Sequence, residues 1–297
     1  TPVLDSGGQQ VNVFFVDATG GGDGTQSNPY TLAELAADGA NGPGDAVMLL
    51  SGSGVINGNI ALQDRQQLWG AGDTGTQTLT LGATNAPLTL TGLGGRAGIN
   101  AGAVLTTVTL ADANLLQGFN ITGGDRGVYG DGFTGLTARD LDVRDTVNQG
   151  ICANSFAGDV LVADNVLGNT GRHAIHMNNG DGTFTATGNT ILSTLGENGI
   201  TVTQGVASTL AFTITDNSIS NTAGHGIFFQ SFINNGATLT GTVRGNSIEN
   251  AGSTGIYSSA QDGATATLRL AGNHISGSGV AGILGGAGID GVLNGTL

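Results

Sequence analysis

The stretch Gly188-Asn189-Thr190-Ile191 recurs, with small changes, through the second half of this 297-residue sequence. Each copy has an Asn that follows Gly or Asp and stands two positions before an aliphatic residue. The other copies are Asp164-Asn165-Val166-Leu167, Asp216-Asn217-Ser218-Ile219, Gly245-Asn246-Ser247-Ile248 and Gly272-Asn273-His274-Ile275. Successive Asn residues are 24, 28, 29 and 27 positions apart. A short, nearly fixed period of this kind is typical of a solenoid built from repeated units.

A second feature repeats with the same period. About ten residues after each Asn, a small residue is followed by Ile, as in Ala174-Ile175 and Gly199-Ile200. Two earlier units fit the pattern with Phe119 and Leu141 in place of the Asn. Seven matched units therefore run from about residue 116 to about residue 285.

Each unit alternates apolar and polar residues, as in Phe184/Ala186 and Phe212/Ile214. This period of two predicts short strands with one buried face. The position two after the Asn and the Ile segment give a second and a third strand, with Gly, Asn and Ser in the turns. The sequence thus predicts an all-β parallel β-helix with three short strands per rung and about ten rungs, each burying its inward residues against the next.

The repeated Asn has a structural explanation. A sharp turn between two strands favours a residue whose side chain can hydrogen-bond the turn backbone. Asn amides stacked on successive rungs can also bond each other, each bond contributing about 0.5–1.5 kcal/mol. We expect a structural ladder of Asn165, Asn189, Asn217, Asn246 and Asn273, continued by an apolar stack at Phe119 and Leu141.

This repeat resembles the right-handed parallel β-helix of the pectate-lyase-like superfold, which carries an asparagine ladder at its short second turn. The N-terminal segment from Phe15-Val16-Asp17 through the Gly/Asp loop at 20–24 to Asn28-Pro29-Tyr30 is similar to the beginning of many secreted β-helix proteins. The resemblance implies a short helix at Thr31–Ala37, with Leu32 and Leu35 covering the open end of the core.

We expect one continuous domain, with a strand and capping helix in residues 1–45 and the β-helix in residues 46–297. The less regular stretches between 45 and 115, Leu79-Thr80-Leu81 and Leu88-Thr89-Leu90 among them, are interpreted as early rungs of varying length. Residues 292–297 carry no capping pattern, so the β-helix is expected to be truncated at its C-terminus and to stop inside a longer protein.

Composition excludes several classes of function. The formal net charge is −14, all eight cations are Arg, and there is no Lys. Such a chain offers no basic surface for nucleic acid, and it rules out a lysine base, a lysine Schiff base and a P-loop. The single cysteine, Cys152, excludes an intramolecular disulfide and a cysteine-based zinc site. No apolar run is long enough for a transmembrane helix, so no direct membrane insertion is expected.

The residues after each inward Ile should point outward and stack into columns. This alignment gathers Arg172, His173, His176, Glu197, Asn198 and His225 within three adjacent rungs. Asn178, Phe228, Gln230 and Tyr257 fall on the same face, which the resemblance identifies as the substrate groove of β-helix polysaccharide enzymes.

One interpretation of this face is catalytic, with Arg172, Glu197 and His225 as the reacting groups. Arg172 would neutralise a carboxylate, Glu197 or a His would move a proton, and the aromatic residues with His173, His176, Asn178, Asn198 and Gln230 would bind sugar. The other interpretation is a solvated scaffold face. Of the polygalacturonase-like motifs only Gly224-His225-Gly226 is present, and the missing Asp-Asp pair argues against a two-carboxylate mechanism.

The favoured prediction is therefore a secreted or cell-surface scaffold that resembles adhesins and autotransporter passengers and binds glycans or a host or matrix surface. The alternative is a polysaccharide lyase or glycoside hydrolase. We expect an extracellular or bacterial cell-surface monomer without a cofactor. A Ca²⁺ site on Asp140, Asp142 and Asp145 is a secondary hypothesis, against pairing of these acids with Arg139 and Arg144.

Overall fold

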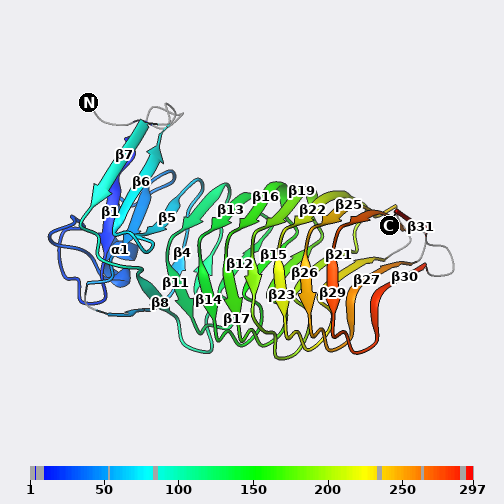
Figure 1. Cartoon of the computed structure of the whole chain (residues 1–297). Coiled ribbons are helices and arrows are strands. Elements are labelled where there is room, and N and C mark those ends of the chain that lie inside the picture. Colours follow the sequence, from blue (N-terminus) through cyan, green and yellow to red (C-terminus); the bar gives the residue numbers. More distant parts are fainter. Residues whose placement is uncertain are drawn as a thin grey trace.

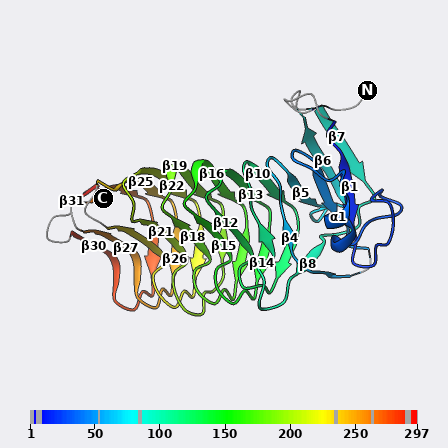
Figure 2. The same cartoon turned by 180° about the vertical axis from the view of Figure 1, so that it is seen from behind.

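The computed structural model describes Leu4 and residues 10–52, 54–82, 86–232, 236–261, 264–287 and 292–296. In these residues the chain winds into a solenoid whose walls are three parallel sheets, A, B and C (Figures 1 and 2). The prediction of an all-β, right-handed parallel β-helix is confirmed. No helix in the described part of the chain is long and apolar enough to cross a membrane.

Sheet A contains eleven strands in the described residues. They are β1 (Val13–Val16), β2 (Ala46–Leu49), β5 (Gln67–Gly70), β10 (Asn114–Gln117), β13 (Thr134–Arg139), β16 (Ala157–Ala163), β19 (Asp181–Thr187), β22 (Thr209–Thr215), β25 (Thr238–Arg244), β28 (Thr265–Ala271) and β31 (Val292–Thr296). β1, from the expected capping segment, pairs with β2 in the same sheet as the later rungs.

Sheets B and C contain nine strands each in the described residues. Sheet B consists of β3 (Ile56–Asn57), β8 (Gly98–Asn100), β11 (Asn120–Thr122), β14 (Asp142–Arg144), β17 (Val166–Gly168), β20 (Thr190–Ile191), β23 (Ser218–Ser220), β26 (Ser247–Glu249) and β29 (His274–Ser276). Sheet C consists of β4 (Ile60–Ala61), β9 (Val108–Thr109), β12 (Val128–Asp131), β15 (Ile151–Asn154), β18 (Ile175–Asn178), β21 (Ile200–Gln204), β24 (Ile227–Ser231), β27 (Thr254–Ala260) and β30 (Ala281–Ala287).

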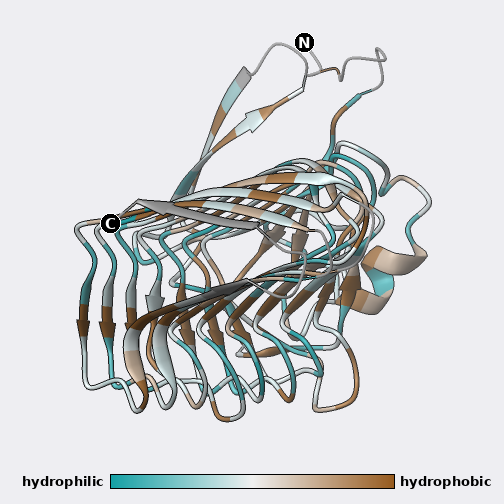
Figure 3. Ribbon diagram, turned by 90° about the vertical axis from the view of Figure 1, so that its right-hand side faces the viewer, coloured by the Kyte–Doolittle hydropathy of each residue, from teal (hydrophilic) through white to brown (hydrophobic). Residues whose placement is uncertain are grey.

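The three walls enclose one apolar core along the axis (Figure 3). The inward residues of equivalent strands stack in register, as Ile175, Ile200 and Ile227 do in sheet C. All three are fully buried. Each rung therefore covers the apolar side chains of the next, which is the source of stability in a solenoid.

The predicted asparagine ladder lies at the turn from sheet A to sheet B. Asn189 Nδ2 donates to Asn217 Oδ1 at 2.9 Å and to the carbonyl oxygen of Val162 at 2.9 Å. The same side-chain bond joins each successive pair from Asn165 to Asn273. Before the first rung of the ladder, Phe119 and Leu141 are buried in the core, as expected for an apolar stack.

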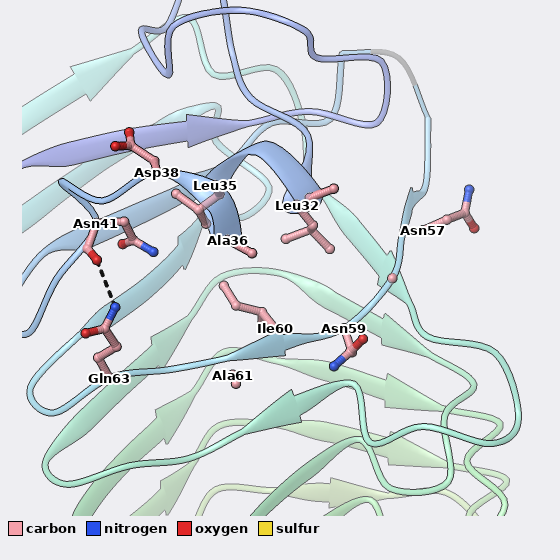
Figure 4. A pocket seen from close by; sticks show the side chains of 12 residues that line it. Leu32, Leu35, Ala36, Asp38, Asn41, Asn57, Asn59, Ile60, Ala61 and Gln63 are labelled. Atoms are coloured by element: carbon pink, nitrogen blue, oxygen red, sulfur yellow. Dashed lines mark hydrogen bonds between the residues drawn. The ribbon is translucent and has the colours of Figure 1, made fainter.

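The predicted capping helix is α1 (Leu32–Ala37), with Thr31 as its N-cap. Thr31 and Glu34 form a capping box, in which each side chain bonds the other residue's backbone N–H and satisfies free donors of the first turn. Leu32 and Leu35 are buried in the main core beside Ile60 of the first rung (Figure 4). The helix thus closes the N-terminal end of the solenoid.

The interpretation of Leu79–Leu81 and Leu88–Leu90 as early rungs is wrong. These residues belong to β6 (Thr76–Leu81) and β7 (Ala86–Thr91), which pair antiparallel in a hairpin outside the three walls (Figure 1). Only four residues separate the two strands, too few for the crossover that parallel pairing requires. The hairpin covers a second apolar cluster on the outer face of sheet A, with Trp69, Leu79 and Leu93 buried in it.

Candidate functional site

The outward face of sheet C carries three columns of side chains, in the register that the sequence alignment predicted. The first column lies in the turn before the strands, or at the first strand residue in the case of Thr254, and reads Arg126, Gln149, His173, Asn198, His225, Thr254. The second reads Tyr129, Cys152, His176, Thr201, Phe228, Tyr257, Leu284. The third reads Asp131, Asn154, Asn178, Thr203, Gln230, Ser259.

One turn leading into this face is longer than its neighbours. Ile200 stands eleven positions after Asn189, whereas the equivalent Ile stands ten positions after the Asn on the rungs before and after it. The additional residue is accommodated at Leu195, whose side chain is 67% exposed. Thr194 Oγ1 donates to the Glu197 carbonyl at 2.6 Å and closes the widened turn. Glu197 stands three residues before Ile200, as Arg172 stands three before Ile175, and these Ile residues pair in sheet C, so Glu197 lies over Arg172.

The Glu197 carboxylate is bound through both oxygens to the preceding rung. Arg172 donates to Oε1 from Nε at 2.7 Å and from Nη2 at 2.6 Å. His173 Nε2 lies 2.7 Å from Oε2. Arg172 and Glu197 are half-exposed, whereas His173 is buried. The result is a cluster in which a half-exposed ion pair contacts a buried imidazole.

His173 is a neutral imidazole with a defined tautomer. Its Nδ1 accepts from the Asn198 backbone N–H at 3.4 Å, so the proton is on Nε2 and is donated to Glu197. Burial, with the nearby positive charge of Arg172, lowers the pKa of His173 to about 4.

Hydrogen bonds continue from His173 to the next rung. Thr201 Oγ1 lies 3.0 Å from His173 Nδ1 and accepts from Asn198 Nδ2 at 3.1 Å. Asn198 Oδ1 in turn accepts from the His225 backbone N–H at 2.8 Å. The three candidate catalytic residues are therefore connected, Arg172 and Glu197 directly and His225 through Asn198.

Three rings form a cluster beside this network. The ring centroids of Phe228 and Tyr257 are 5.3 Å apart with nearly parallel planes, and His225 stacks on Tyr257 at 4.9 Å and on Phe228 at 5.4 Å. His225 Nδ1 accepts from the Thr254 N–H, which leaves the proton on Nε2. Partial burial lowers the pKa of His225, so this ring is neutral near pH 7.

The third column forms a chain of polar side chains across four rungs. Asn154 donates to Asp131 at 2.7 Å, Asn178 to Asn154 at 2.6 Å and Thr203 to Asn178 at 2.8 Å. The strand register places Gln230 directly beyond Thr203. This chain is the outer border of the candidate site, and Asn178 and Gln230 are part of it as predicted.

His176 and Cys152 lie beneath the exposed part of the face. His176 Nδ1 is 3.9 Å from Cys152 Sγ, and its ring centroid is 4.6 Å from that of His173. Burial lowers the pKa of His176 to about 3 and raises the pKa of the Cys152 thiol to about 11. At neutral pH the pair is an uncharged imidazole and a thiol, a structural contact without an activated nucleophile.

Sequence alignment alone missed the roles of Thr201 and Thr194. Thr201 is buried in the hydrogen-bond network, and Thr194 closes the turn that presents Glu197. The sequence held a signal for Thr194: the buried Thr146, Thr170, Thr194 and Thr222 recur at the repeat period. The additional residue before Ile200 was also readable, as a departure from a spacing of ten.

The acids considered for Ca²⁺ have protein partners. Asp140 pairs with Arg96 at 2.6 Å, a partner the sequence did not indicate, and Asp142 pairs with Arg144 at 2.6 Å as expected. Asp145 accepts from Asn169 Nδ2 at 3.1 Å. The expected partner Arg139 bonds Gln117 instead. Within the described residues, no group of three or more His, Cys, Asp or Glu side chains could hold a metal ion.

Two cavities lined by described residues lie away from this face. One, of about 500 Å³, lies between α1 and the first rung, against Leu32, Leu35 and Ile60 (Figure 4). The other, of about 390 Å³, lies beside Arg96 and Asp140 at the turn from sheet A to sheet B. Two loops follow the strands of this face, at 204–208 and 232–238, and sequence position makes them candidate walls of a groove. Residues 204–208 are described, whereas 233–235 lie outside the described residues.

Comparison with known proteins agrees with the repeat and the topology. The sequence profile described as "Right handed beta helix region" matches residues 126–293. The chain belongs to this right-handed β-helix family. The matched region contains every residue of the candidate site. No curated protein sequence matches the chain.

Solved structures resemble this β-helix in fold alone. Pectate lyase Pel9A superposes with a TM-score of 0.53 at 11% identity, over 92% of this chain and 78% of the lyase chain. The GH136 lacto-N-biosidase from Eubacterium ramulus gives a TM-score of 0.42 at 11% identity, over 96% and 68% of the two chains. The Azotobacter vinelandii mannuronan C-5 epimerase AlgE6 A-module gives 0.40 at 15% identity, over 89% and 94%.

Proposed function

We propose that the outward face of sheet C, centred on Arg172 and Glu197, binds a polysaccharide. The observation that carries this proposal is the contact of Glu197 with Arg172 and His173, which lies in the expanded turn at Leu195. Insertions in repeat proteins collect on one face, which is often the binding face. Here the expanded turn carries Glu197, on the same face as the rings and amides.

The chemistry of the face suits sugars. A sugar ring offers hydroxyl groups that donate and accept, and apolar C–H faces that pack on side chains. Arg172, Asn178 and Gln230 supply polar groups, and the half-buried Phe228 and Tyr257 supply apolar surface beside them. Because these groups extend over successive rungs, the site suits a linear chain of sugars better than a single one.

Several expectations belong to this proposal. The fold shared with a pectate lyase is consistent with glycan recognition, and the acidic, cysteine-poor composition is consistent with an extracellular or bacterial cell-surface monomer. Neither the comparisons nor the geometry of the face supports an adhesin-like or autotransporter-passenger role, so the proposal is limited to the glycan-binding face of this β-helix.

Binding to immobilised polysaccharides tests the proposal. The panel contains galactan, mannan, β-glucan, polygalacturonate and alginate, and the variants are Arg172→Ala and Arg269→Ala. Arg269 is exposed in β28 on sheet A and provides a matched loss of one guanidinium. We expect at least a tenfold loss of affinity for Arg172→Ala and none for Arg269→Ala. Equal affinities of the two variants would place the binding surface elsewhere, and failure of the wild-type protein to bind any polymer would refute the function.

A second candidate function is cleavage of the bound chain. It is favoured by the direct contact of Arg172 with Glu197 and by the link through Asn198 to His225, which bring the predicted catalytic residues together. Ultraviolet absorbance of unsaturated product reports a lyase, and reducing ends report a hydrolase. Turnover that disappears in Glu197→Gln and persists in Glu249→Gln would establish this candidate, because Glu249 lies on sheet B. Absence of turnover on every bound polymer would refute it.

A further inference from the structure

The two guanidinium groups on the sheet C face are both already neutralised. Among the described residues the cations of this face are Arg126 and Arg172. Arg172 donates to Glu197 at 2.6 Å, and Arg126 Nη1 lies 3.0 Å from an Asp125 carboxylate oxygen. Arg126 also donates from Nε to Gln149 and lies over the Tyr129 ring at 4.6 Å. Neither cation is left to pair with a ligand anion.

The other titratable groups of the face do not add positive charge near pH 7. His173 and His176 are neutral because burial lowers their pKa values to about 4 and about 3. Asp131, at the border of the site, is bonded by an amide and not by a cation. A carboxylate placed beside Glu197 would therefore meet a like charge, without an unpaired cation to offset the cost of removing it from water.

We infer that this face selects uncharged polysaccharides and discriminates against uronate polymers. The inference rests on the proposed function and specifies its substrate class. Hydroxyl groups can bond the outer donors of Arg172 and the amides of Asn178 and Gln230 without breaking the Arg172–Glu197 pair. Carboxylates would have to compete with Glu197 for Arg172. Glu197 thus provides the selectivity against carboxylated polymers, because its carboxylate is already paired with the Arg172 guanidinium.

The test compares each polymer with its own carboxylated form. Galactan, mannan and β-glucan are used as such and after oxidation of their primary hydroxyl groups to carboxylates, so that the backbone is kept. Affinity is measured with the full chain at about 0.15 M salt, where the Debye length of about 8 Å screens the distant part of the −14 net charge. We expect the carboxylated form of any bound polymer to bind at least tenfold more weakly than the neutral form.

A charge variant tests the assigned role of Glu197. Glu197→Gln leaves Arg172 without its counterion and is expected to raise affinity for the carboxylated polymers at least tenfold, with less effect on the neutral ones. Glu249→Gln makes the same change in net charge away from the face and should alter neither affinity. Thermal unfolding of both variants verifies that they fold.

The outcomes separate the inference from the function on which it rests. Wild-type protein that binds neither form of any polymer refutes the proposed function. Equal or tighter binding of the carboxylated forms refutes the inference and leaves glycan binding intact. A folded Glu197→Gln protein that gains no affinity for carboxylated polymers refutes the assignment of selectivity to Glu197.

Discussion

Glu197 Oε1 lies 2.6 Å from Arg172 Nη2, across two neighbouring rungs. Both residues stand three positions before an inward Ile, and Ile175 pairs with Ile200, so rung stacking places Glu197 over Arg172. Deleting Leu195 restores the spacing of ten residues and removes the widened turn that Thr194 closes on the Glu197 carbonyl, so polysaccharide affinity should fall at least tenfold. The solenoid should persist, because Leu195 is exposed. Affinity and thermal unfolding, measured on the same preparation, check both expectations.

An insertion in an equivalent turn further along the solenoid is the matched control. A glycine added after Ser278 expands the turn before β30, three rungs from Glu197, so it perturbs the backbone comparably without displacing Glu197 or His225. Binding should survive this insertion. If the protein lacking Leu195 keeps wild-type affinity, the expanded turn has no part in recognition.

The buried histidines predict a loss of stability in acid. His173 and His176 have folded-state pKa values of about 4 and about 3, below the ordinary value of 6.5. Between these values the unfolded chain binds protons that the folded chain does not, so the free energy of unfolding falls as the pH drops from about 6.5 towards 4. The full contribution is present above pH 6.5. For His173 alone, the free energy of unfolding is lower by about 3 kcal/mol once the pH lies below the folded-state pKa of about 4.

Substitution of these histidines separates their titration from that of the carboxylates. His176→Gln should be less stable at neutral pH but should flatten the dependence of the unfolding free energy on pH between 6.5 and 4. His274→Gln replaces an exposed histidine and should leave that slope unchanged. Urea unfolding at each pH supplies the free energies. A slope identical in the wild type and in His176→Gln would contradict the assignment.

How much of the fold could be predicted depended on the repeat. From about residue 116 onward, one residue per rung fixes the register of three sheets, and the columns read from the sequence match the strand pairing. Before residue 116, the alternation of apolar and polar residues around Leu79 and Leu88 does not belong to a repeated unit. A period of two indicates a strand but does not distinguish a parallel wall from an antiparallel hairpin, and there the sequence prediction was wrong.

The candidate site was predictable in position but not in detail. The columns correctly brought Arg172, His173 and Glu197 together, since rung stacking alone places them. Which polar group bonds which depended on turn lengths and burial that an alignment does not contain. Thr201, for example, stands at an outward position yet is buried, because His173 and Asn198 bond its hydroxyl.

A single methyl group added at Gly241, in the core, should lower the free energy of unfolding. A Cβ added at Gly241 would lie 2.1 Å from the ring of Phe212, which stacks on Phe229 with centroids 4.7 Å apart. Gly241→Ala should therefore lower the free energy of unfolding by about 1–3 kcal/mol through overpacking. The expected control is Gly95→Ala, where nothing lies within 4 Å of the added carbon.

A second substitution tests the steric cause. Phe212→Leu removes the ring that the new methyl group would meet, so the double variant should lose less stability than the two single losses together. Residues in contact commonly show such coupling, of about 0.5–3 kcal/mol. Additive losses in this cycle would mean that Phe212 is not the obstacle.

The thiol of Cys152 should be inert in the folded protein. Burial raises its pKa to about 11, and only 5% of the residue is exposed. Reaction depends on the thiolate and on access, so a thiol-reactive dye at pH 8 should label the native chain at least a hundredfold more slowly than the chain in denaturant. Rapid labelling of the native protein would contradict the buried assignment of Cys152.

The ladder predicts that an Asn in its middle matters more than one at its end. The side chain of Asn189 accepts from both the backbone and the side-chain nitrogen of Asn165, and it donates to Asn217 and to the Val162 carbonyl. Asn189→Ala leaves several of these buried groups without partners, at about 1–3 kcal/mol for each group left unsatisfied. A total loss of at least 3 kcal/mol in urea unfolding is expected. At Asn273, which is only partly buried, water can replace the lost partners, so Asn273→Ala should cost less than half as much. Equal losses at the two positions would mean that the ladder stabilises the turn locally and not by bonding between rungs.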